Sequence, residues 1–289
     1  KKGVDVFHSP HYTLPLGSGR RSVATIHDLI HLRFPEYFSI FQRAYALVVM
    51  RHAVHDAGAV IANSQFTKQD LLKTFRIDEG KIHIIHPGIG SEFRKIERDK
   101  EVEDFRRRYQ LRNPFILYVG SVKAHKNIPI LLRAYKNFSA SNKDVELVFA
   151  GERLLQNLML KEEVEALGIA PRVKELGWIP NEDLVSAYNS AEVLVLPSQY
   201  EGFGFPALEA MACGTPVIVS DAGSLPEIVG DAGVLFSTPD PHSLGDALRA
   251  VLCDAGLREK LIARGKRNVN RFSWDDAARK TLQVYESLL

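Results

Sequence analysis

The feature that most constrains the fold is a regular alternation of two kinds of segment from Pro114 onward. Short apolar runs, rich in β-branched residues, alternate with amphipathic stretches whose apolar positions recur at helical spacing. Near-continuous apolar runs are typical of parallel strands that are covered on both faces. This part of the chain is therefore expected to be a doubly wound α/β domain. The expected strands are 115–119, 145–150, 173–176, 193–196, 217–219 and 234–236, and the expected helices are 128–138, 154–167, 181–190, 206–213 and 241–252.

The first part of the chain shows the same alternation over fewer segments. Ser64 is a suitable N-cap for its second helix, because a serine hydroxyl can accept a hydrogen bond from an orphan backbone N–H. The chain begins almost directly with a strand, so this domain is expected to lack its first strand–helix units through an N-terminal truncation. The expected strands are 4–7, 23–26, 59–61 and 82–85, and the expected helices are about 39–56 and 66–75.

These patterns divide the chain into two α/β domains and a terminal helix. Residues 1–112 form a partial first domain that ends in a charged connection, and residues 113–272 form the second domain. Residues 273–289 form a final helix that Ser273 can cap, with acidic residues favourable in its first turn. The 289 residues are comfortable for two domains of ordinary size.

Composition excludes several classes of protein. Hydrophobic residues make up 45% and charged residues 25%, which argues against a disordered chain. No apolar run approaches the roughly 18–20 residues that cross a bilayer, and the first residues lack the apolar stretch of a signal peptide. Cys213 and Cys253 cannot form a disulfide framework. A soluble, cytoplasmic protein is expected.

Charge is distributed unevenly between the two domains. Up to Arg112 there are 19 Lys or Arg against 13 Asp or Glu, and the remainder has 18 against 22. A basic first domain can meet nucleic acid, anionic lipid or a phosphorylated ligand. Few aromatic residues lie near the basic run 106–108, which argues against nucleic acid. A solvated helix face is the simplest interpretation of that run, and peripheral contact with the anionic inner face of a membrane stays open.

The most informative segment runs from Pro197 to Glu209. It follows a buried strand and opens a helix, and ligands of open α/β sheets bind beyond the carboxyl ends of strands. Gly202 and Gly204 allow close approach of the backbone to an anion near the helix N-terminus. Two carboxylates beside such a loop, Glu201 and Glu209, would repel a phosphate but can accept hydrogen bonds from the hydroxyls of a sugar or a ribose.

The same residues carry a family resemblance. The Glu201-x7-Glu209 spacing and the segments that follow it, 210–217, 220–227 and 230–233, resemble those of family-4 retaining glycosyltransferases. The resemblance implies two Rossmann-like domains of GT-B type that face each other across a cleft, with a nucleotide sugar held by the second. It also implies that Glu201 acts on donor-sugar hydroxyls, that Glu209 meets the ribose, and that the backbone of Gly202, Phe203 and Gly204 lies beside the sugar and diphosphate.

A second element is the segment from Tyr118 to Asn127, which leaves the first strand of the second domain and enters a helix. Lys126 lies near that helix N-terminus and can reach a diphosphate, whose growing charge a basic group stabilises as the bond to the sugar breaks. In the family an Arg often follows the glycine of this element; here Ser121 follows Gly120. Lys123 or His125 is left to supply the second positive charge.

A third element places a His-Asp pair, His27 and Asp28, at the carboxyl end of a first-domain strand. The resembling segment of the family holds a histidine close to the donor sugar, so His27 is expected in the active site beside Glu201. A histidine at a strand end is otherwise more often structural. His8 and His11 follow the preceding strand, so they and Asp28 are candidates for contact with the acceptor.

Other chemistries are less well supported. The paired histidines lie on four separate segments without a cysteine or an obvious acidic companion, so no metal site and no cofactor are expected. The Gly-x-Ser-x-Gly motif of hydrolases and the Gly-x-Gly-x-x-Gly motif of nicotinamide sites do not occur.

The leading hypothesis is a retaining hexosyltransferase that moves a sugar from a nucleotide donor to the hydroxyl of a glycan or lipid-linked acceptor in polysaccharide or glycoconjugate synthesis. The element at Gly120 and the His-Asp segment look most like those of mannosyltransferases, so GDP-mannose is the first donor to consider. A sugar-nucleotide epimerase or hydrolase of the same architecture, or a catalytically silent binding module, are the alternatives.

Overall fold

The computed structural model describes residues 3–97 and 99–289, and their contacts divide the chain into two compact units. Unit 1 consists of Lys1–Gly88, Tyr200–Phe203 and Phe272–Leu289. Unit 2 consists of Ile89–Gln199 and Gly204–Arg271. The charged connection assigned above to the first domain, residues 89–112, therefore belongs to unit 2, and the final helix belongs to unit 1.

Unit 1 contains a parallel sheet whose described strands lie in chain order, β1-β2-β3-β4. Strand β1 begins at Phe7, three residues after the expected start, because the register pairs Phe7 with Ser22. The helix α1 was not expected, since it is a single turn of four residues. The elements are β1 (Phe7–Ser9), β2 (Ser22–Ile26), α1 (Ile30–Arg33), α2 (Ile40–Asp56), β3 (Ala59–Ala62), α3 (Gln65–Thr74), β4 (Ile82–Ile84) and α12 (Trp274–Glu286).

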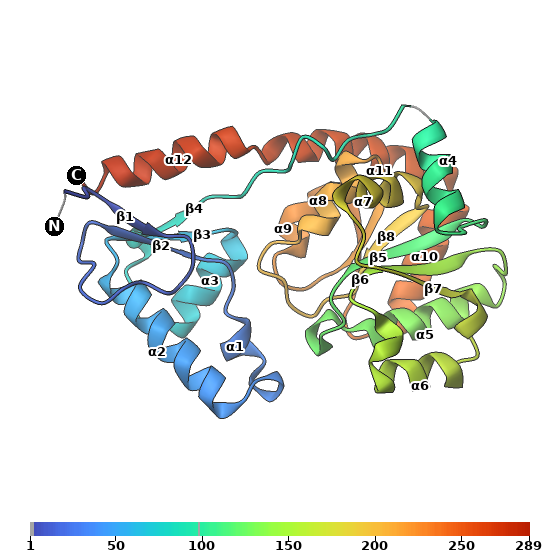
Figure 1. Cartoon of the computed structure of the whole chain (residues 1–289), viewed down its shortest axis with the longest axis horizontal. Coiled ribbons are helices and arrows are strands. Elements are labelled where there is room, and N and C mark those ends of the chain that lie inside the picture. Colours follow the sequence, from blue (N-terminus) through green and yellow to red (C-terminus); the bar gives the residue numbers. More distant parts are fainter. Residues whose placement is uncertain (1–2, 98) are drawn as a thin grey trace. The chain divides into compact units, whose positions relative to one another are not determined.

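The two faces of this sheet carry different helices. Val60 and Ala62 of β3 pack with buried residues of α2 and α3. The alternate positions, Ala59 and Ile61, pack with Ala277 and other residues of α12 on the opposite face (Figure 1). Alternation along a strand thus explains how one short sheet is covered on both sides. Ser64 and Ser273 cap α3 and α12 as expected, accepting hydrogen bonds from the backbone N–H groups of Thr67 and Asp276.

Unit 2 contains a parallel sheet with the strand order β10-β9-β8-β5-β6-β7 among the described residues. Its elements are α4 (Asp99–Arg108), β5 (Phe115–Gly120), α5 (Ile128–Ser139), β6 (Glu146–Gly151), α6 (Leu158–Ala166), β7 (Val173–Gly177), α7 (Asn181–Ser190), β8 (Val193–Leu196), α8 (Phe205–Ala212), β9 (Val217–Ser220), α9 (Leu225–Val229), β10 (Gly233–Phe236), α10 (Pro241–Cys253) and α11 (Ala255–Asn268).

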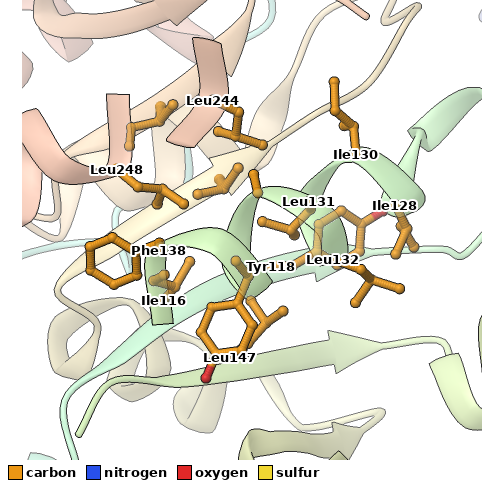
Figure 2. Packing of buried hydrophobic residues seen from close by; sticks show 14 of the residues in the cluster. Ile116, Tyr118, Ile128, Ile130, Leu131, Leu132, Phe138, Leu147, Leu244 and Leu248 are labelled. Atoms are coloured by element: carbon orange, nitrogen blue, oxygen red, sulfur yellow. The ribbon is translucent and has the colours of Figure 1, made fainter. Parts of the chain in front are cut away.

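The core of unit 2 forms where α5 and α10 cover one face of the sheet. Ile116 and Tyr118 of β5 and Leu147 of β6 point toward apolar side chains of both helices, which include Phe138 and Leu248 (Figure 2). Helices α7 and α8 contact the sheet as well, and every residue of β8 and β9 is buried. The buried β8 and β9 explain why the sequence shows near-continuous apolar runs there.

The expected helices of unit 2 differ from the observed ones in detail. The helix expected over 154–167 is a short 3-10 turn, Leu154–Gln156, followed by α6, because Asn157 caps a new helix by accepting a hydrogen bond from the backbone N–H of Leu160. Helix α11 was not expected, since six of its 14 residues are charged and its buried residues are few. Over residues 3–97 and 99–289, no helix combines the length and the apolarity needed to cross a membrane.

Candidate active site

The strand order of unit 2 reverses beside β5. The chain runs from β5 outward through β6 to β7, and then returns to place β8 on the other side of β5. The loops that leave β5 and β8 therefore diverge from neighbouring strands at the same edge of the sheet. Such a reversal point is where open α/β sheets bind their ligands, and it brings together the two segments singled out in the sequence.

The loop after β5 is held in a defined conformation. Gly120 has a φ of 147°, which favours glycine, and the Tyr118 hydroxyl donates a hydrogen bond to the carbonyl of Ser121 over 2.6 Å. A 3-10 turn, Ala124–Lys126, then leads into α5 through Asn127 in the left-handed conformation. Lys126 is thus partly buried, and it lies near the N-terminus of α5, as expected.

The two candidates for a second positive charge in this loop differ in exposure. Lys123 is exposed, whereas His125 is buried and its carbonyl accepts a hydrogen bond from the backbone N–H of Gln199 over 2.8 Å. That bond ties the loop after β5 to the loop after β8. Because His125 is buried between the two loops and Lys123 is exposed, Lys123 is the better candidate for contact with a diphosphate.

The loop after β8 ends at Gly204, where a Cβ atom would displace the side chain of Leu225. Gly204 has a φ of 107° and precedes α8, and a Cβ atom there would lie 2.7 Å from Cδ2 of Leu225. Upstream, the Ser220 hydroxyl donates to the carbonyl of Ser198 over 2.5 Å, which joins this loop to the end of β9. The backbone therefore turns tightly into the positive end of a helix.

Glu209 lies in α8 and is held by a tyrosine that the sequence analysis missed. The Tyr188 hydroxyl of α7 donates to a carboxylate oxygen of Glu209 over 2.6 Å. Burial raises the pKa of Glu209, and the charge of Glu92 raises it further, although the hydrogen bond from Tyr188 opposes both effects. Tyr188 is itself fixed, because the Thr215 hydroxyl donates to its carbonyl over 2.5 Å. The hydrogen bond from Tyr188 thus orients the carboxylate of Glu209.

In unit 1 the candidate histidines lie at the carboxyl ends of β1 and β2. The ring of His27 is exposed, and its Nε2 lies 2.9 Å from the carbonyl oxygen of Pro10. The ring centroid of His11 lies 6.4 Å from that of His27, and burial together with the nearby His27 lowers the pKa of His11. Asp28 accepts a hydrogen bond from the backbone N–H of Ile30 over 3.0 Å at the start of α1.

His8 has a different environment from the other histidines. Its ring nitrogens lie 2.6 Å from the Tyr285 hydroxyl and 2.8 Å from the Thr25 hydroxyl. Burial lowers its pKa. These bonds join β1, β2 and α12, so His8 has a packing role in this unit whatever else it contacts.

Within unit 1, the segment Tyr200–Phe203 is held mainly by contacts of Gly202, which lies between Glu201 and Phe203. The Ser64 hydroxyl donates to the carbonyl of Gly202 over 2.8 Å, and a Cβ atom on Gly202 would lie 2.1 Å from the carbonyl oxygen of His27. Glu201 is partly buried. The ring of Phe203 is buried 5.7 Å, between centroids, from that of Phe272. The backbone of this segment therefore lies directly against the backbone of His27.

Tyr200 anchors the same segment through a buried network that the sequence analysis also missed. Its hydroxyl donates to Asp70 of α3 over 2.7 Å and accepts a hydrogen bond from the backbone N–H of Leu29 over 2.9 Å. Asp70 also pairs with Arg33 of α1. Because Tyr200 precedes Glu201 and Leu29 follows His27 by two residues, the network fixes both candidate catalytic residues relative to each other.

The candidate residues thus fall into two groups, each described within its own unit. Unit 2 brings together the ends of β5 and β8 with the first turns of α8, and unit 1 brings together the ends of β1 and β2 with the segment that contains Glu201. Among residues 3–97 and 99–289, no group of three or more His, Cys, Asp or Glu side chains could hold a metal ion. The unit 2 group contains Gly120, Ser121, Lys126, Gly204 and Glu209; the unit 1 group contains His8, His11, His27, Asp28, Glu201, Gly202 and Phe203.

Two family models match successive parts of the chain. The model of the family "Glycosyl transferases group 1" matches residues 99–268, and that of "Glycosyltransferase Family 4" matches residues 1–93. The O-antigen chain mannosyltransferase B of Escherichia coli is 32% identical over 286 residues, which are 98% of this chain and 74% of that protein.

Solved structures resemble the whole chain. Sucrose-phosphate synthase from Thermosynechococcus elongatus matches with a TM-score of 0.82 and 26% identity, over 100% of this chain and 74% of that one. HepE from Anabaena, in complex with UDP-glucose, matches with a TM-score of 0.79 and 21% identity, over 92% of this chain and 72% of that one. The expected GT-B type of fold is thereby confirmed. With both family models and the mannosyltransferase relative in agreement, this chain belongs to the group 1 and family 4 glycosyltransferases.

Proposed function

We propose that this chain transfers mannose from GDP-mannose to a hydroxyl of a glycan acceptor, with retention of the anomeric configuration. The observation that carries the proposal is the strand reversal of unit 2, where Lys126 and the Gly204 turn lie on loops from neighbouring strands. The mannosyltransferase relative supports mannose as the sugar. Polysaccharide or glycoconjugate synthesis is the corresponding process.

Different residues of unit 2 would hold the diphosphate and the ribose of the donor. Lys126, with Lys123 as the second basic group, would neutralise the diphosphate, and the Gly120–Ser121 turn would leave room for it. Glu209, already oriented by Tyr188, would accept the ribose hydroxyls. The backbone of Gly204 would lie beside the phosphates at the start of α8.

The reacting end of the donor would meet the unit 1 group. In the proposed reaction the acceptor oxygen forms a bond to the anomeric carbon on the face from which the diphosphate leaves. The bond between that carbon and the diphosphate oxygen breaks, and a phosphate oxygen takes the acceptor proton. Glu201 and His27 would position the sugar and stabilise its charge without a covalent intermediate. The backbone of Gly202 and the ring packing of Phe203 would hold Glu201 in place.

A glycan, free or linked to a lipid, is the acceptor we propose, with His11 and Asp28 as its nearest candidates in unit 1. The basic groups would supply the positive charge that the leaving diphosphate needs, so we propose no metal and no other cofactor. An epimerase or a hydrolase would need no acceptor, and a silent binding module would bind the donor without turnover.

A donor screen tests the proposal directly. Calorimetry with GDP-, UDP-, ADP- and TDP-sugars should give the tightest binding for GDP-mannose, and the anomeric coupling in the product should match that of the donor. UDP-glucose is the second candidate donor, because HepE binds it. Conversion of the donor without an acceptor would favour an epimerase or hydrolase, and saturable binding without turnover would favour a silent module.

A further inference from the structure

The helix α3 of unit 1 places three polar side chains in the interior of the protein. Ser64, which caps the helix, and Thr67 are 0% exposed, and Asp70 is 5% exposed. Their spacing of i, i+3 and i+6 places them along one side of the helix. Burial of a polar group costs free energy unless a hydrogen bond compensates it, so these three side chains need partners inside the protein.

Two of these residues hold the carbonyl of Gly202. The Ser64 hydroxyl donates a hydrogen bond to that carbonyl over 2.8 Å. The hydroxyl of Thr67 lies 3.3 Å from the same oxygen, and it also lies 3.3 Å from the carbonyl oxygen of His27. The start of α3 therefore fixes the backbone immediately after Glu201.

The third residue, Asp70, holds the side chain of Tyr200, which immediately precedes Glu201. The Tyr200 hydroxyl donates a hydrogen bond to Asp70 over 2.7 Å. The Tyr200 ring packs edge to face against Phe34 and Phe66, at centroid distances of 5.7 and 5.4 Å. Burial raises the pKa of Tyr200, and the charge of Asp70 raises it further. The hydroxyl therefore keeps its proton at neutral pH and can donate it to Asp70.

The two carboxylate oxygens of Asp70 serve two different partners. Oδ2 accepts the hydrogen bond from Tyr200, whereas Oδ1 pairs with the guanidinium of Arg33. An amide in this place would offer one oxygen and one NH2 group. It could therefore satisfy Tyr200 or Arg33 but not both, so the whole arrangement requires a carboxylate.

The segment that α3 holds differs from its neighbours in the chain. Tyr200–Phe203 belongs to unit 1, whereas β8 before it and α8 after it belong to unit 2. Glu201 is thus held by unit 1, although Glu209 of the same motif lies in unit 2. A catalytic group works only when it is held close to its productive position, and the contacts of α3 hold the backbone on both sides of Glu201.

We propose that Asp70 is a positioning residue for the proposed transfer reaction, on which this role rests. Through Tyr200, Asp70 holds the backbone of Glu201 at the reacting end of the donor, and Thr67 supports the same backbone through Gly202. The side chains of Asp70 and Thr67 are both buried, so they act through the segment and not by contact with the donor.

Steady-state kinetics on the whole chain, with its preferred donor, tests this role. Asp70→Asn should lower kcat about tenfold and leave the donor KM within about twofold, because a displaced reacting group slows the reaction without weakening ground-state binding. In the Glu201→Gln background, Asp70→Asn should lower kcat by less than about twofold, because residues that act as a unit have non-additive effects. A residue that only stabilised the fold would give the same factor in both backgrounds.

A second pair of variants tests the role without removing a buried charge. Thr67→Val removes the hydroxyl and keeps the branched shape of the side chain. It should lower kcat about fivefold, the effect of losing one ordinary hydrogen bond in the transition state, and only while Glu201 is present. Thr67→Ser keeps the hydroxyl and should retain kcat within about twofold of the unaltered chain.

The matched control is Glu79→Gln. The Glu79 side chain is 66% exposed, and its carboxylate pairs with Lys68 of α3 over 2.8 Å. Like Asp70→Asn, the control removes one negative charge and one ion pair from α3, but it does so at an exposed position. Glu79→Gln should therefore leave both kcat and the donor KM unchanged.

Hydrogen exchange measured by mass spectrometry gives a second readout that needs no turnover. In Asp70→Asn the backbone amides of Tyr200–Phe203 should exchange at least about fivefold faster than in the unaltered chain, because a segment that loses its contacts opens more often. The amides of β8, which belongs to unit 2, should exchange at the same rate in both proteins.

Equal losses of kcat from Asp70→Asn with and without the Glu201 carboxylate would overturn the proposal, and so would unchanged exchange of Tyr200–Phe203. If Asp70→Asn does not fold, Thr67→Val in the two backgrounds supplies the same comparison. Full turnover by Glu201→Gln would contradict the proposed role of Glu201 itself, and this positioning role with it. Absence of turnover with every donor would contradict the proposed function alone, and the exchange rates would then decide whether Asp70 holds the segment.

Discussion

Both sheets of this molecule are parallel, but their strands follow the chain in different orders. In unit 1 the described strands add in chain order, each beside the last, whereas in unit 2 the order reverses at β5. A reversal of this kind lets the loops that leave neighbouring strands diverge at one edge of the sheet, where open α/β sheets bind their ligands. The reversal supports the proposal that unit 2 binds the nucleotide, and the hydrogen bonds around His27 support the proposal that unit 1 positions the reacting groups.

Gly202→Ala should have the largest effect, because a Cβ atom would lie 2.1 Å from the His27 carbonyl oxygen and the backbone would have to move. A displacement of about 1 Å near reacting groups can lower the rate roughly 10²-fold, so donor turnover should fall by at least that factor. The control is Gly256→Ala, where the nearest atom to the new Cβ is a side-chain oxygen at 3.4 Å. Turnover equal to that of the unaltered chain would show that this close approach has no role.

Glu201→Gln should separate the role of unit 1 from that of unit 2. An interaction at the reacting centre strengthens in the transition state, so this change should lower kcat on the order of 10²-fold with little change in donor KM. Steady-state kinetics over a range of donor concentrations distinguishes the two. A change in KM alone would show that Glu201 contacts a part of the donor remote from its reacting end.

Tyr200→Phe should loosen the segment Tyr200–Phe203 of unit 1 while leaving the side chains of Glu201 and His27 in the chain. The change leaves the backbone N–H of Leu29 and a buried oxygen of Asp70 without their partner, at a cost of about 1–3 kcal/mol. The midpoint of thermal unfolding should fall, and kcat should fall about tenfold, the loss that about 1.4 kcal/mol in the barrier produces. Tyr45→Phe, which alters an exposed hydroxyl, is the control and should change neither quantity.

Glu209→Gln should act through the donor KM, with a loss of about 1–2 kcal/mol and little change in kcat. Because burial raises the pKa of Glu209, donor binding by the unaltered chain should weaken on acidification at a higher pH than an ordinary carboxylate would predict. The glutamine variant should lack that pH dependence. Isothermal titration calorimetry at several pH values measures the donor affinity of both proteins. The same pH dependence in the unaltered chain and in Glu209→Gln would contradict the proposed contact between Glu209 and the donor.

The raised pKa of Glu209 also has a consequence for stability. A carboxyl group whose pKa is higher in the folded state lowers stability above that pKa and has no such effect below the pKa of the unfolded chain. Glu209→Gln should therefore raise the unfolding midpoint at neutral pH, and the gain should disappear as the pH falls. A gain that persists in acid would point to a cause other than ionisation.

The sequence predicted most of the fold because parallel strands buried on both faces leave an unmistakable apolar pattern. It located β8 and the helix that follows, and with them Glu201, Gly204 and Glu209. It missed α11, in which six of the 14 residues are charged and the apolar periodicity is weak. It also placed β1 three residues early, since the true boundary depends on pairing with β2 and not on local sequence.

The contacts that orient the candidate site could not be predicted in the same way. Tyr188 reaches Glu209 from another helix, and Tyr200 reaches Asp70 across 130 positions of sequence. Both tyrosines are buried, and a sequence pattern does not show which polar group a buried hydroxyl meets. Their roles depend on which hydroxyl meets which carboxylate, and only the folded chain determines that.

The most direct test of the division between the two units is the affinity for the nucleoside diphosphate of the preferred donor, measured by calorimetry on the whole chain. Lys126→Ala should weaken binding about tenfold or more, because a charge-assisted hydrogen bond contributes about 1.5–3 kcal/mol. His27→Ala should leave that affinity within about twofold while lowering transfer, since a contact that acts only in the transition state does not alter ground-state binding. Unchanged affinity in Lys126→Ala, or lost affinity in His27→Ala, would contradict the assignment of nucleotide binding to unit 2.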